Sequence, residues 1–220
     1  MPPDDALVTC AGTALTFGRD ARAVVAVHGA NLTIRPGDRL AIVGSSGSGK
    51  TSLLHLIAGL ERPTTGTVTR AAGLEPSEIG LVFQNDSLIP ALNVLENAAL
   101  PMILADRPET EAQQAALTAL AQVGVQNLAD RLPEEISGGQ AQRVAVARVL
   151  SQAPRLILAD EPTGRLDHAS GARVLDALLA AADLTRAALV VTTHDPSVAA
   201  RLAQRRTMRG GRLLAPEETP

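Results

Sequence analysis

One octapeptide constrains the fold of this chain more than any other feature. It reads Gly44-Ser45-Ser46-Gly47-Ser48-Gly49-Lys50-Thr51. It fits the pattern G-x-x-x-x-G-K-[ST], and it lies between a short apolar segment at 39–43 and a stretch at 51–60 whose leucines have helical spacing. Glycines let backbone N–H groups wrap around phosphate oxygens, and the N-terminus of a following helix favours the same anion. The sequence therefore predicts a strand, a phosphate-binding loop and a helix, in a chain that binds a nucleotide.

The residue types in and after this loop fit ATP and Mg²⁺. We expect Lys50 to reach the β- and γ-phosphates and the Thr51 hydroxyl to bind Mg²⁺. Lys50 is the only lysine among the 20 basic residues. A genome that favours arginine codons explains this depletion, but a compact ammonium is what this one position requires. The expected ATP-binding residues of the loop are Gly44, Ser45, Ser46, Gly47, Ser48, Gly49, Lys50, Thr51 and Ser52.

Two carboxylates follow the apolar segment at 156–159. Asp160 and Glu161 come directly after it, and an open α/β sheet places its ligand site at the carboxyl ends of its strands. We expect Asp160 to belong to the Mg²⁺ shell and Glu161 to act as general base on the attacking water. The alternative is a polar strand end that caps the next turn, and the phosphate loop makes that interpretation the weaker one.

The order of apolar and polar segments predicts an α/β fold. Strands are expected at 7–17, 23–34, 39–43, 67–69, 79–83, 156–159 and 188–192, with a hairpin at 206–214. In the first part of the chain we expect an interruption at 28–29. Helices are expected at 51–60, 93–104, 109–123, 137–152, 169–182 and 196–203. Alternation of strands and helices predicts a mostly parallel sheet. The whole chain, 1–220, is expected to form one domain, with an inserted helical subdomain at approximately 86–150.

Composition narrows the class of protein. Hydrophobic residues make up 45% of the chain, but it has two Phe and no Tyr or Trp, so the core must be packed from aliphatic side chains. The net charge of −3 argues against a broad nucleic-acid-binding surface, and we expect no nucleic-acid partner. No apolar stretch reaches the roughly 20 residues of a membrane-spanning helix, and the N-terminus lacks the features of a signal peptide. Cys10, the only cysteine, fits a reducing compartment.

A second glycine-containing segment indicates a family. Ser137-Gly138-Gly139-Gln140 opens the helix predicted at 137–152. Ser137 and Gln140 fit a simple capping box, but two glycines at a helix start are costly unless something must approach closely. The segment resembles the LSGGQ signature of ABC ATPases. In that family, the signature meets the γ-phosphate of the ATP bound by the opposite subunit.

Other positions resemble the same family in order and spacing. Gln84 resembles the Q-loop glutamine, Asp167 ends a segment similar to the D-loop, and His194 resembles the switch histidine that senses the γ-phosphate. Phe17 stands where the family has an aromatic residue that stacks on adenine, with a core phenylalanine as the alternative. This resemblance implies that Glu161, His194, Gln84 and Lys50 are catalytic, that Thr51, Gln84 and Asp160 bind the metal, and that Ser137, Gly138, Gly139, Gln140 and Asp167 contact ATP from the opposite subunit.

The resemblance extends over about residues 7–214 and implies a whole architecture. That architecture is a P-loop NTPase (RecA-like) core with a mostly parallel sheet, a small antiparallel β-subdomain and an inserted helical subdomain that carries the signature. The chain is most similar to the branch of lipoprotein-release, macrolide-export and cell-division ATPases. The implied function is ATP hydrolysis as a subunit of an ABC transporter. The implied partners are a second ABC subunit, the same or paired, in the ATP-bound state, and integral membrane permease subunits at the cytoplasmic face of the cell membrane.

The chain departs from the pattern of that branch at several positions, and other functions remain open. Arg165 replaces the usual Asn of the D-loop, and Thr192 replaces the usual Val, which we take as a mild change. Ala141 replaces a larger polar residue, and the segment 70–78 is shorter than usual. None of these changes removes a catalytic group, so an active enzyme is expected. The main alternative is a cell-division-type ABC ATPase that signals through a membrane partner without transport. Soluble ABC proteins of DNA repair or translation are disfavoured, because their coiled-coil insertions, zinc modules and tandem domains are missing. A small P-loop kinase has no use for the signature helix.

Overall fold

The elements of the structure follow the predicted order closely. The computed structural model describes residues 5–18, 20–84 and 87–215. Its strands are β1 (Val8–Phe17), β2 (Val24–Ile34), β3 (Arg39–Val43), β4 (Thr65–Arg70), β5 (Ile79–Val82), β6 (Leu156–Asp160), β7 (Ala188–Thr193), β8 (Gln204–Arg209) and β9 (Arg212–Leu213). Its α-helices are α1 (Lys50–Ala58), α2 (Val94–Leu104), α3 (Glu109–Gln122), α4 (Gly138–Leu150), α5 (His168–Thr185) and α6 (Pro196–Ala199). Short 3₁₀ helices lie at Asp20–Arg22, Pro76–Glu78, Gln126–Leu128 and Pro133–Glu135.

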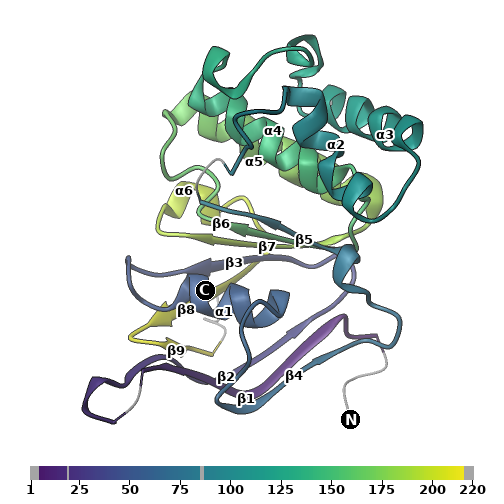
Figure 1. The fold of residues 1–220 in the computed structure, drawn as a ribbon. Helices are drawn as coiled ribbons and strands as arrows, with labels where there is room; N and C mark the ends of the chain where they lie inside the picture. Colours follow the sequence, from purple (N-terminus) through teal and green to yellow (C-terminus); the bar gives the residue numbers. More distant parts are fainter. Residues whose placement is uncertain (1–4, 19, 85–86, 216–220) are drawn as a thin grey trace.

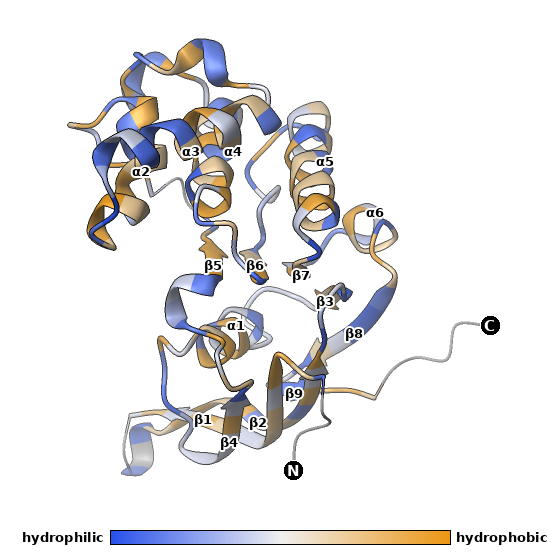
Figure 2. Ribbon diagram, turned by 90° about the vertical axis from the view of Figure 1, so that its right-hand side faces the viewer, coloured by the Kyte–Doolittle hydropathy of each residue, from blue (hydrophilic) through white to orange (hydrophobic). Residues whose placement is uncertain are grey.

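The strands form two sheets. The larger has six strands in the order β5-β6-β7-β3-β8-β9, and all its neighbouring pairs are parallel except β8 and β9. The smaller sheet is antiparallel, with the order β2-β1-β4. Helix α1 lies between the two sheets, and α2, α3, α4 and α5 lie on the other side of the larger sheet (Figures 1 and 2). The predicted α/β class, with a mostly parallel sheet and a small antiparallel one, is confirmed.

Alternate residues of the central strands belong to two separate apolar clusters. Leu156 and Leu158 of β6 pack with α1 and the antiparallel sheet, whereas Ile157 and Ala159 pack with α2–α5. All four side chains have no exposed surface. Successive side chains of a strand point to opposite faces, so a strand covered on both faces must be apolar at every position. This is why β6 and β7 read as continuous apolar runs.

Cys10 belongs to the same aliphatic core as α1. It lies on β1 and is 3% exposed. Burial raises the pKa of its thiol to about 11, partly offset by a hydrogen bond with Thr13. The thiol is therefore a neutral packing group and not a reactive one. None of the helices in the described part of the chain is both long and apolar enough to span a bilayer.

Two local expectations were wrong. The predicted interruption at 28–29 is a bulge inside one continuous strand, β2. Between the pairs Thr13–Ala30 and Leu15–Val27, β2 contains one residue more than β1, and Gly29 has a φ of 61°. A β-bulge accommodates one extra residue while pairing continues on both sides, which local sequence does not distinguish from a break.

The helix predicted at 196–203 has one turn, Pro196–Ala199. The next amides, Arg201 N and Leu202 N, donate to the carbonyls three residues earlier, at 3.2 Å each. Such bonds tighten the chain into a turn, and β8 begins directly afterwards, where Gln204 pairs with Leu40. Pairing with the sheet therefore ends the helix before its local propensity would.

Gly80 allows α4 to pack closely on the edge strand β5. A Cβ atom at Gly80 would overlap with Cγ1 of Val149 on α4. We expect Gly80→Ala to lower the free energy of unfolding by about 1–3 kcal/mol, because overpacking in a tight contact forces neighbours out of position. Urea denaturation measures this. When Val149 is also replaced by Ala, Gly80→Ala should lower the free energy of unfolding much less. An equal loss from Gly80→Ala with Val149 and with Ala at position 149 would contradict the contact.

Candidate functional site

The phosphate-binding loop connects β3 to α1 and is held tightly by its surroundings. Gly49, the residue before α1, has a φ of 101°. A Cβ atom there would overlap with the carbonyl oxygen of Ala26 on β2, and one at Gly44 would overlap with that of Met208 on β8. Gly49 is therefore required both for its backbone conformation and for lack of space, and Gly44 is required for lack of space alone.

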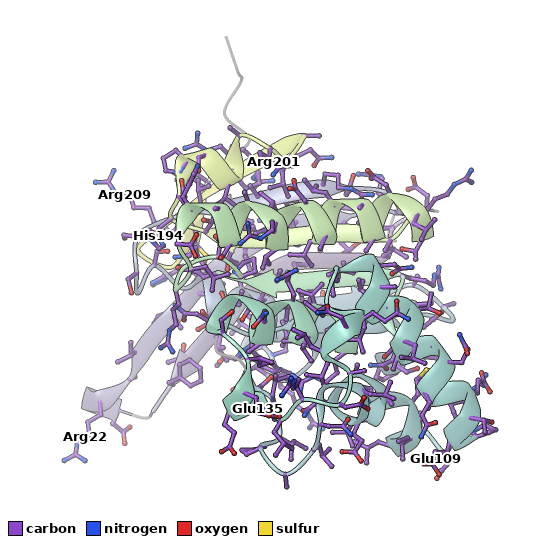
Figure 3. The ribbon with its side chains drawn as sticks, turned by 90° about the horizontal axis from the view of Figure 1, so that it is seen from above. Arg22, Glu109, Glu135, His194, Arg201 and Arg209 are labelled. Atoms are coloured by element: carbon purple, nitrogen blue, oxygen red, sulfur yellow. The ribbon has the colours of Figure 1, made fainter. Side chains whose placement is uncertain are left out.

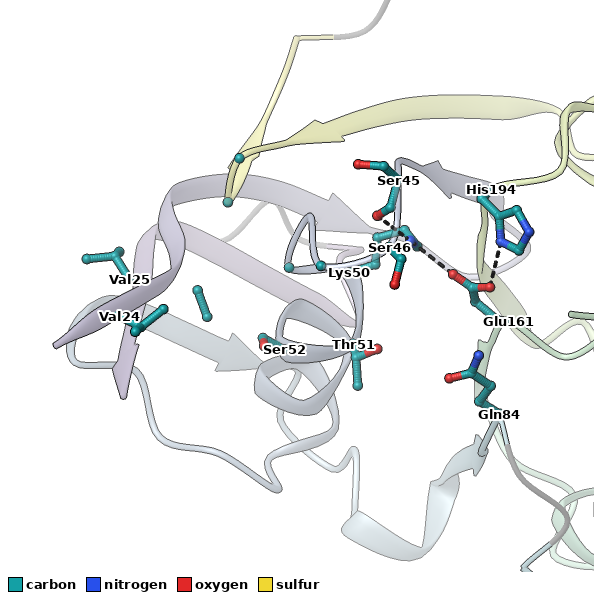
Figure 4. Close-up of a pocket in the computed structure, with 15 residues that line it drawn as sticks. Val24, Val25, Ser45, Ser46, Lys50, Thr51, Ser52, Gln84, Glu161 and His194 are labelled. Carbon is teal, nitrogen blue, oxygen red and sulfur yellow. Dashed lines mark hydrogen bonds and ion pairs between the residues drawn. The ribbon is translucent and has the colours of Figure 1, made fainter. Parts of the chain in front are cut away.

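Lys50 lies under this loop and points to the end of β6. Its side chain is 4% exposed, and its Nζ donates to the carbonyl oxygens of Gly44 at 2.8 Å and Ser45 at 3.0 Å. The same ammonium forms an ion pair with Glu161, at 3.0 Å from Oε1 (Figure 4). Two charges taken out of water need such pairing and additional hydrogen bonds, because either one left alone is costly.

Glu161 is also held by His194. The second carboxylate oxygen, Oε2, lies 2.7 Å from Nδ1 of His194, whose side chain is 58% exposed (Figure 4). The Glu161 backbone has a φ of 43°, in the left-handed region, and its amide donates to Thr192 O at 3.1 Å and Oγ1 at 3.0 Å. A non-glycine residue in this region carries strain that surrounding contacts must offset, and such residues concentrate at functional sites.

Asp160 is oriented by two hydroxyl groups. Thr51 Oγ1 donates to its Oδ2 at 2.7 Å, and Thr192 Oγ1 donates to its Oδ1 at 2.5 Å. Asp160 is 4% exposed, and it pairs in register with Thr192 across β6 and β7. The hydroxyl of Thr51 and the carboxylate of Asp160 are hard oxygen donors, of the kind that Mg²⁺ prefers beside the phosphates of its nucleotide.

These side chains line one cleft at the carboxyl edge of the larger sheet. The cleft has a volume of about 830 Å³ and includes Gln84, which follows β5, together with Glu161 and His194 (Figure 4). From the predicted loop residues it includes Ser45, Ser46, Gly47, Gly49, Lys50, Thr51 and Ser52. The catalytic and metal-binding residues expected from the sequence thus come together, apart from Asp160, which lies behind Thr51.

Three predicted ATP-binding residues do not line this cleft. Two of them, Gly44 and Ser48, belong to the loop but are not part of the lining, and among the described residues the buried Ser48 Oγ has no hydrogen-bond partner. Phe17 lies at the end of β1, paired with Val24 of β2 and 45% exposed. Val24 and Val25 form part of the cleft lining, so Phe17 is next to the cleft and not in it.

The residues expected to form the signature and the D-loop lie on other elements, apart from the cleft. Ser137 caps α4: its Oγ accepts from Gln140 N at 3.3 Å, and its own amide donates to Gln140 Oε1 at 2.7 Å. This is the predicted capping box. Asp167 caps α5 by accepting from Ser170 N at 3.0 Å, and hydrogen bonds from Ser170 lower the pKa of its carboxyl. Figure 3 shows Glu135, just before the signature, well away from His194.

The signature helix and α5 are in direct contact. A Cβ atom at Gly139 would lie 3.1 Å from Cβ and Oγ of Ser170, so a larger residue would press α4 away from α5. A Cβ atom at Gly138 would instead have no neighbouring group of the described residues within 4 Å. The two glycines therefore serve different purposes: Gly139 permits helix packing, and Gly138 leaves the helix start accessible.

Thr192 is a site residue that sequence reasoning underestimated. The pattern of the branch suggests only a mild replacement of Val, but the fully buried hydroxyl bonds both Asp160 and the Glu161 amide. The available signal was a hydroxyl residue in an otherwise apolar buried strand. Val24, Val25, Gly210 and Gly211 also line the cleft without any sequence signal, because only the pairing of distant strands brings them there.

Comparisons with known proteins agree on one family. Residues 27–164 match the family model described as "ABC transporter". The chain is 41% identical to a lipoprotein-releasing system ATP-binding protein, LolD, of Shewanella oneidensis, over 85% of this chain and 86% of that protein. It is 36% identical to the LolD of Pseudomonas syringae pv. tomato, over 96% and 98% respectively.

Solved structures give the same result. The ATP-binding cassette MJ0796, in a dimeric post-hydrolysis state bound to ADP and Pi, superposes with a TM-score of 0.85 at 33% identity, over 96% of this chain and 97% of that one. CbiO1 of Clostridium perfringens, part of an ABC transporter complex, has a TM-score of 0.84 over 96% of this chain and 88% of that chain. At 24% identity, this second likeness concerns the fold alone.

Replacing Thr192 tests the hydroxyl that orients the acidic pair. We expect Thr192→Val to lower the free energy of unfolding by about 1–3 kcal/mol, because a buried carboxylate oxygen and an amide each lose a partner. Chemical denaturation measures the change. Thr192→Ser keeps the hydroxyl and is the matched control, with a smaller loss from the missing methyl group. A valine variant as stable as the serine variant would contradict this role.

Proposed function

Because the chain belongs to the ABC transporter family, whose ATP-binding subunits hydrolyse ATP, we propose that it drives lipoprotein release through a membrane-embedded partner. The ATPase activity follows from family membership. The release of lipoproteins is supported by relatives named for it, which are 36–41% identical over most of both chains. The single structural observation that carries the catalytic proposal is Glu161, held between Lys50 and His194 beside the phosphate loop.

Each residue of this group has a distinct role in the proposed mechanism. Glu161 accepts a proton from the attacking water as general base. Lys50 neutralises charge on the β- and γ-phosphates, and the loop amides bind the same oxygens. His194, which reaches the cleft from the end of β7 and contacts Glu161 at 2.7 Å, orients the base and stabilises charge that develops on the γ-phosphate.

The proposed metal site consists of Thr51, Asp160 and Gln84. All three offer oxygen donors, and one carboxylate with neutral oxygens suits Mg²⁺ that is also held by nucleotide phosphates. When bound, Mg²⁺ neutralises negative charge on the phosphate oxygens. Within the chain, Thr192 fixes the orientation of the Asp160 carboxylate, and β5 ends next to β6, which brings Gln84 beside Glu161.

We further propose that two chains complete each ATP site. Ser137, Gly138, Gly139, Gln140 and Asp167 lie apart from the cleft, yet Gly138 leaves the start of α4 accessible and the capped helix N-terminus suits an anion. A head-to-tail dimer, the same chain or a paired ABC subunit, would bring this helix start to the γ-phosphate in the opposite cleft. The dimeric state of the MJ0796 cassette supports this arrangement.

The membrane partner is proposed to dock on the helical side of the molecule, near Gln84. The helical subdomain is proposed to extend over approximately 86–150, of which residue 86 lies outside the described residues. A groove of about 340 Å³ between β5, α2 and α4 is lined by Phe83 and Ile89. These side chains are 39% and 40% exposed, and their position in one groove supports docking there. Docking there would hold the ATPase at the cytoplasmic face of the membrane.

The dimer is tested with a variant that binds ATP without hydrolysing it. We expect Glu161→Gln to lower hydrolysis by about 10²-fold or more, because the general base is lost, and to form a stable dimer with ATP and Mg²⁺. Size-exclusion chromatography with light scattering measures the mass. The matched control, Lys50→Ala/Glu161→Gln, should remain monomeric because phosphate charge is not neutralised. A monomeric Glu161→Gln protein at saturating ATP would contradict the shared site.

The membrane partner is tested by affinity purification of tagged Glu161→Gln from detergent-solubilised native membranes with ATP and Mg²⁺. We expect a membrane protein to co-purify, and far less of it with Lys50→Ala. The recovered complex, returned to liposomes, should release a labelled lipoprotein in an ATP-dependent way. ATP hydrolysis and a membrane partner without lipoprotein release would favour the cell-division-type alternative. Recovery of soluble proteins or nucleic acid alone would contradict the membrane assignment.

A further inference from the structure

Helix α4 contacts the backbone on both sides of Gln84. Before Gln84, the Nε2 atom of Gln142 donates to the carbonyl oxygen of Phe83 at 3.3 Å. After it, Nη1 of Arg148 donates to the carbonyl oxygen of Ser87 at 2.7 Å, and Nη2 donates to the Ser87 hydroxyl. One helix therefore holds the chain at a residue before and a residue after the proposed metal ligand.

Both of these donors are costly to bury. Gln142 is 4% exposed. Burial lowers the pKa of the Arg148 guanidinium, and within the described ranges no carboxylate lies at ion-pair distance from it. A desolvated cation needs partners that replace water, and the carbonyl and hydroxyl oxygens of Ser87 are two of them. The planar fork of arginine fits two acceptors on one residue, which makes the contact directional.

The other end of α4 carries the signature. Ser137 caps the helix, and Arg148 is 11 residues further on, so about 16 Å of helix separates the signature from the contact with Ser87. Arg143, between them, donates to the carbonyl oxygens of Val123 at 3.2 Å and Gly124 at 3.1 Å. Close packing of Val149 on Gly80 fixes the last turn against β5. The same helix therefore connects the signature with the residues that flank Gln84.

We propose that Gln142 and Arg148 are positioning residues for ATP hydrolysis: they couple the position of the signature helix to that of Gln84. This rests on the proposed role of Gln84 as a ligand of Mg²⁺. The two residues touch neither nucleotide nor metal. They act through the backbone at Phe83 and Ser87. Gln84 therefore reaches the position in which it binds Mg²⁺ only when α4 is in the position that brings the signature to ATP.

The test is a double-mutant cycle between Arg148→Met and Gln84→Ala in the full chain. The measurements are kcat for ATP hydrolysis, the Mg²⁺ concentration at half-maximal rate, and the Kd of a fluorescent ATP analogue without Mg²⁺. We expect Arg148→Met to lower kcat about tenfold or more and to raise the Mg²⁺ requirement, because small misplacements of a catalytic constellation are costly. The Kd should change by less than about twofold, since the phosphate loop is untouched. With Gln84→Ala present, Arg148→Met should lower kcat no further.

Matched variants separate positioning from folding. Ser87 is exposed, and Ser87→Ala removes only one acceptor of Arg148; it should shift the Mg²⁺ requirement in the same direction with an unchanged melting temperature. Gln142→Met should resemble Arg148→Met. Arg155→Met removes another arginine that donates to a backbone carbonyl, that of Gly73 at 3.1 Å, and should leave kcat unchanged.

The outcomes distinguish this inference from the proposed function. If Arg148→Met lowers kcat by the same factor with and without Gln84→Ala, Arg148 does not act through Gln84 and the coupling is wrong, while the ATPase assignment stands. If Gln84→Ala alone leaves kcat and the Mg²⁺ requirement unchanged, the proposed role of Gln84 is wrong, and the coupling is overturned with it. A loss confined to Arg148 variants that unfold, with Ser87→Ala behaving as wild type, would also overturn the coupling.

Discussion

The buried ion pair between Lys50 and Glu161 joins the two halves of the proposed catalytic site. Lys50 belongs to the loop after β3, and Glu161 follows β6, with β7 between these two strands in the sheet. At this depth each charge stabilises the other, and the carbonyl groups that Lys50 also contacts add to this. Because both groups stand at the carboxyl edge of parallel strands, the register of the sheet sets their separation. His194, after β7, joins the same pair from the strand between them.

The sheet can hold these charged groups in place because both of its faces are apolar and are packed with aliphatic side chains. Leu156 and Leu158 face α1, and Ile157 and Ala159 face the helices α2–α5. Small and branched side chains allow helices to approach closely, most visibly where Val149 meets Gly80. Gly139 likewise allows α4 to pack closely against α5. Densely packed elements shift between discrete arrangements more readily than they deform continuously. Close packing of this kind therefore allows a displacement of one helix to move its neighbours.

One chain holds the cleft lined by Lys50, Glu161 and His194 and, separately, an accessible helix start that is not part of this cleft. Ser137 and Asp167 cap neighbouring helices, α4 and α5, and the contact between Gly139 and Ser170 links the two starts. A second chain that supplies this pair to the cleft would sense ATP through both helices at once. Arg165, the unusual residue of the D-loop, is exposed, and within the described ranges it forms no ion pair. It therefore places an exposed positive charge on the surface that a second chain would meet in the proposed dimer.

The sequence by itself determined the elements that depend on local chemistry. The phosphate loop, the carboxylates at the end of β6 and the capping box of Ser137 and Gln140 each need particular residue types at nearby positions, so their patterns can be recognised without knowledge of the fold. The buried strands were legible as well, because a strand covered on both faces must be apolar throughout. Only the tertiary structure decided which groups meet across the sheet. Thr192 reaches Asp160 because β6 and β7 pair in that register. Gln142 and Arg148 reach the segment of Gln84 because α4 packs on β5. The bulge at Gly29 and the early end of α6 have the same origin: long-range strand pairing overrides local preference, and no local pattern records it.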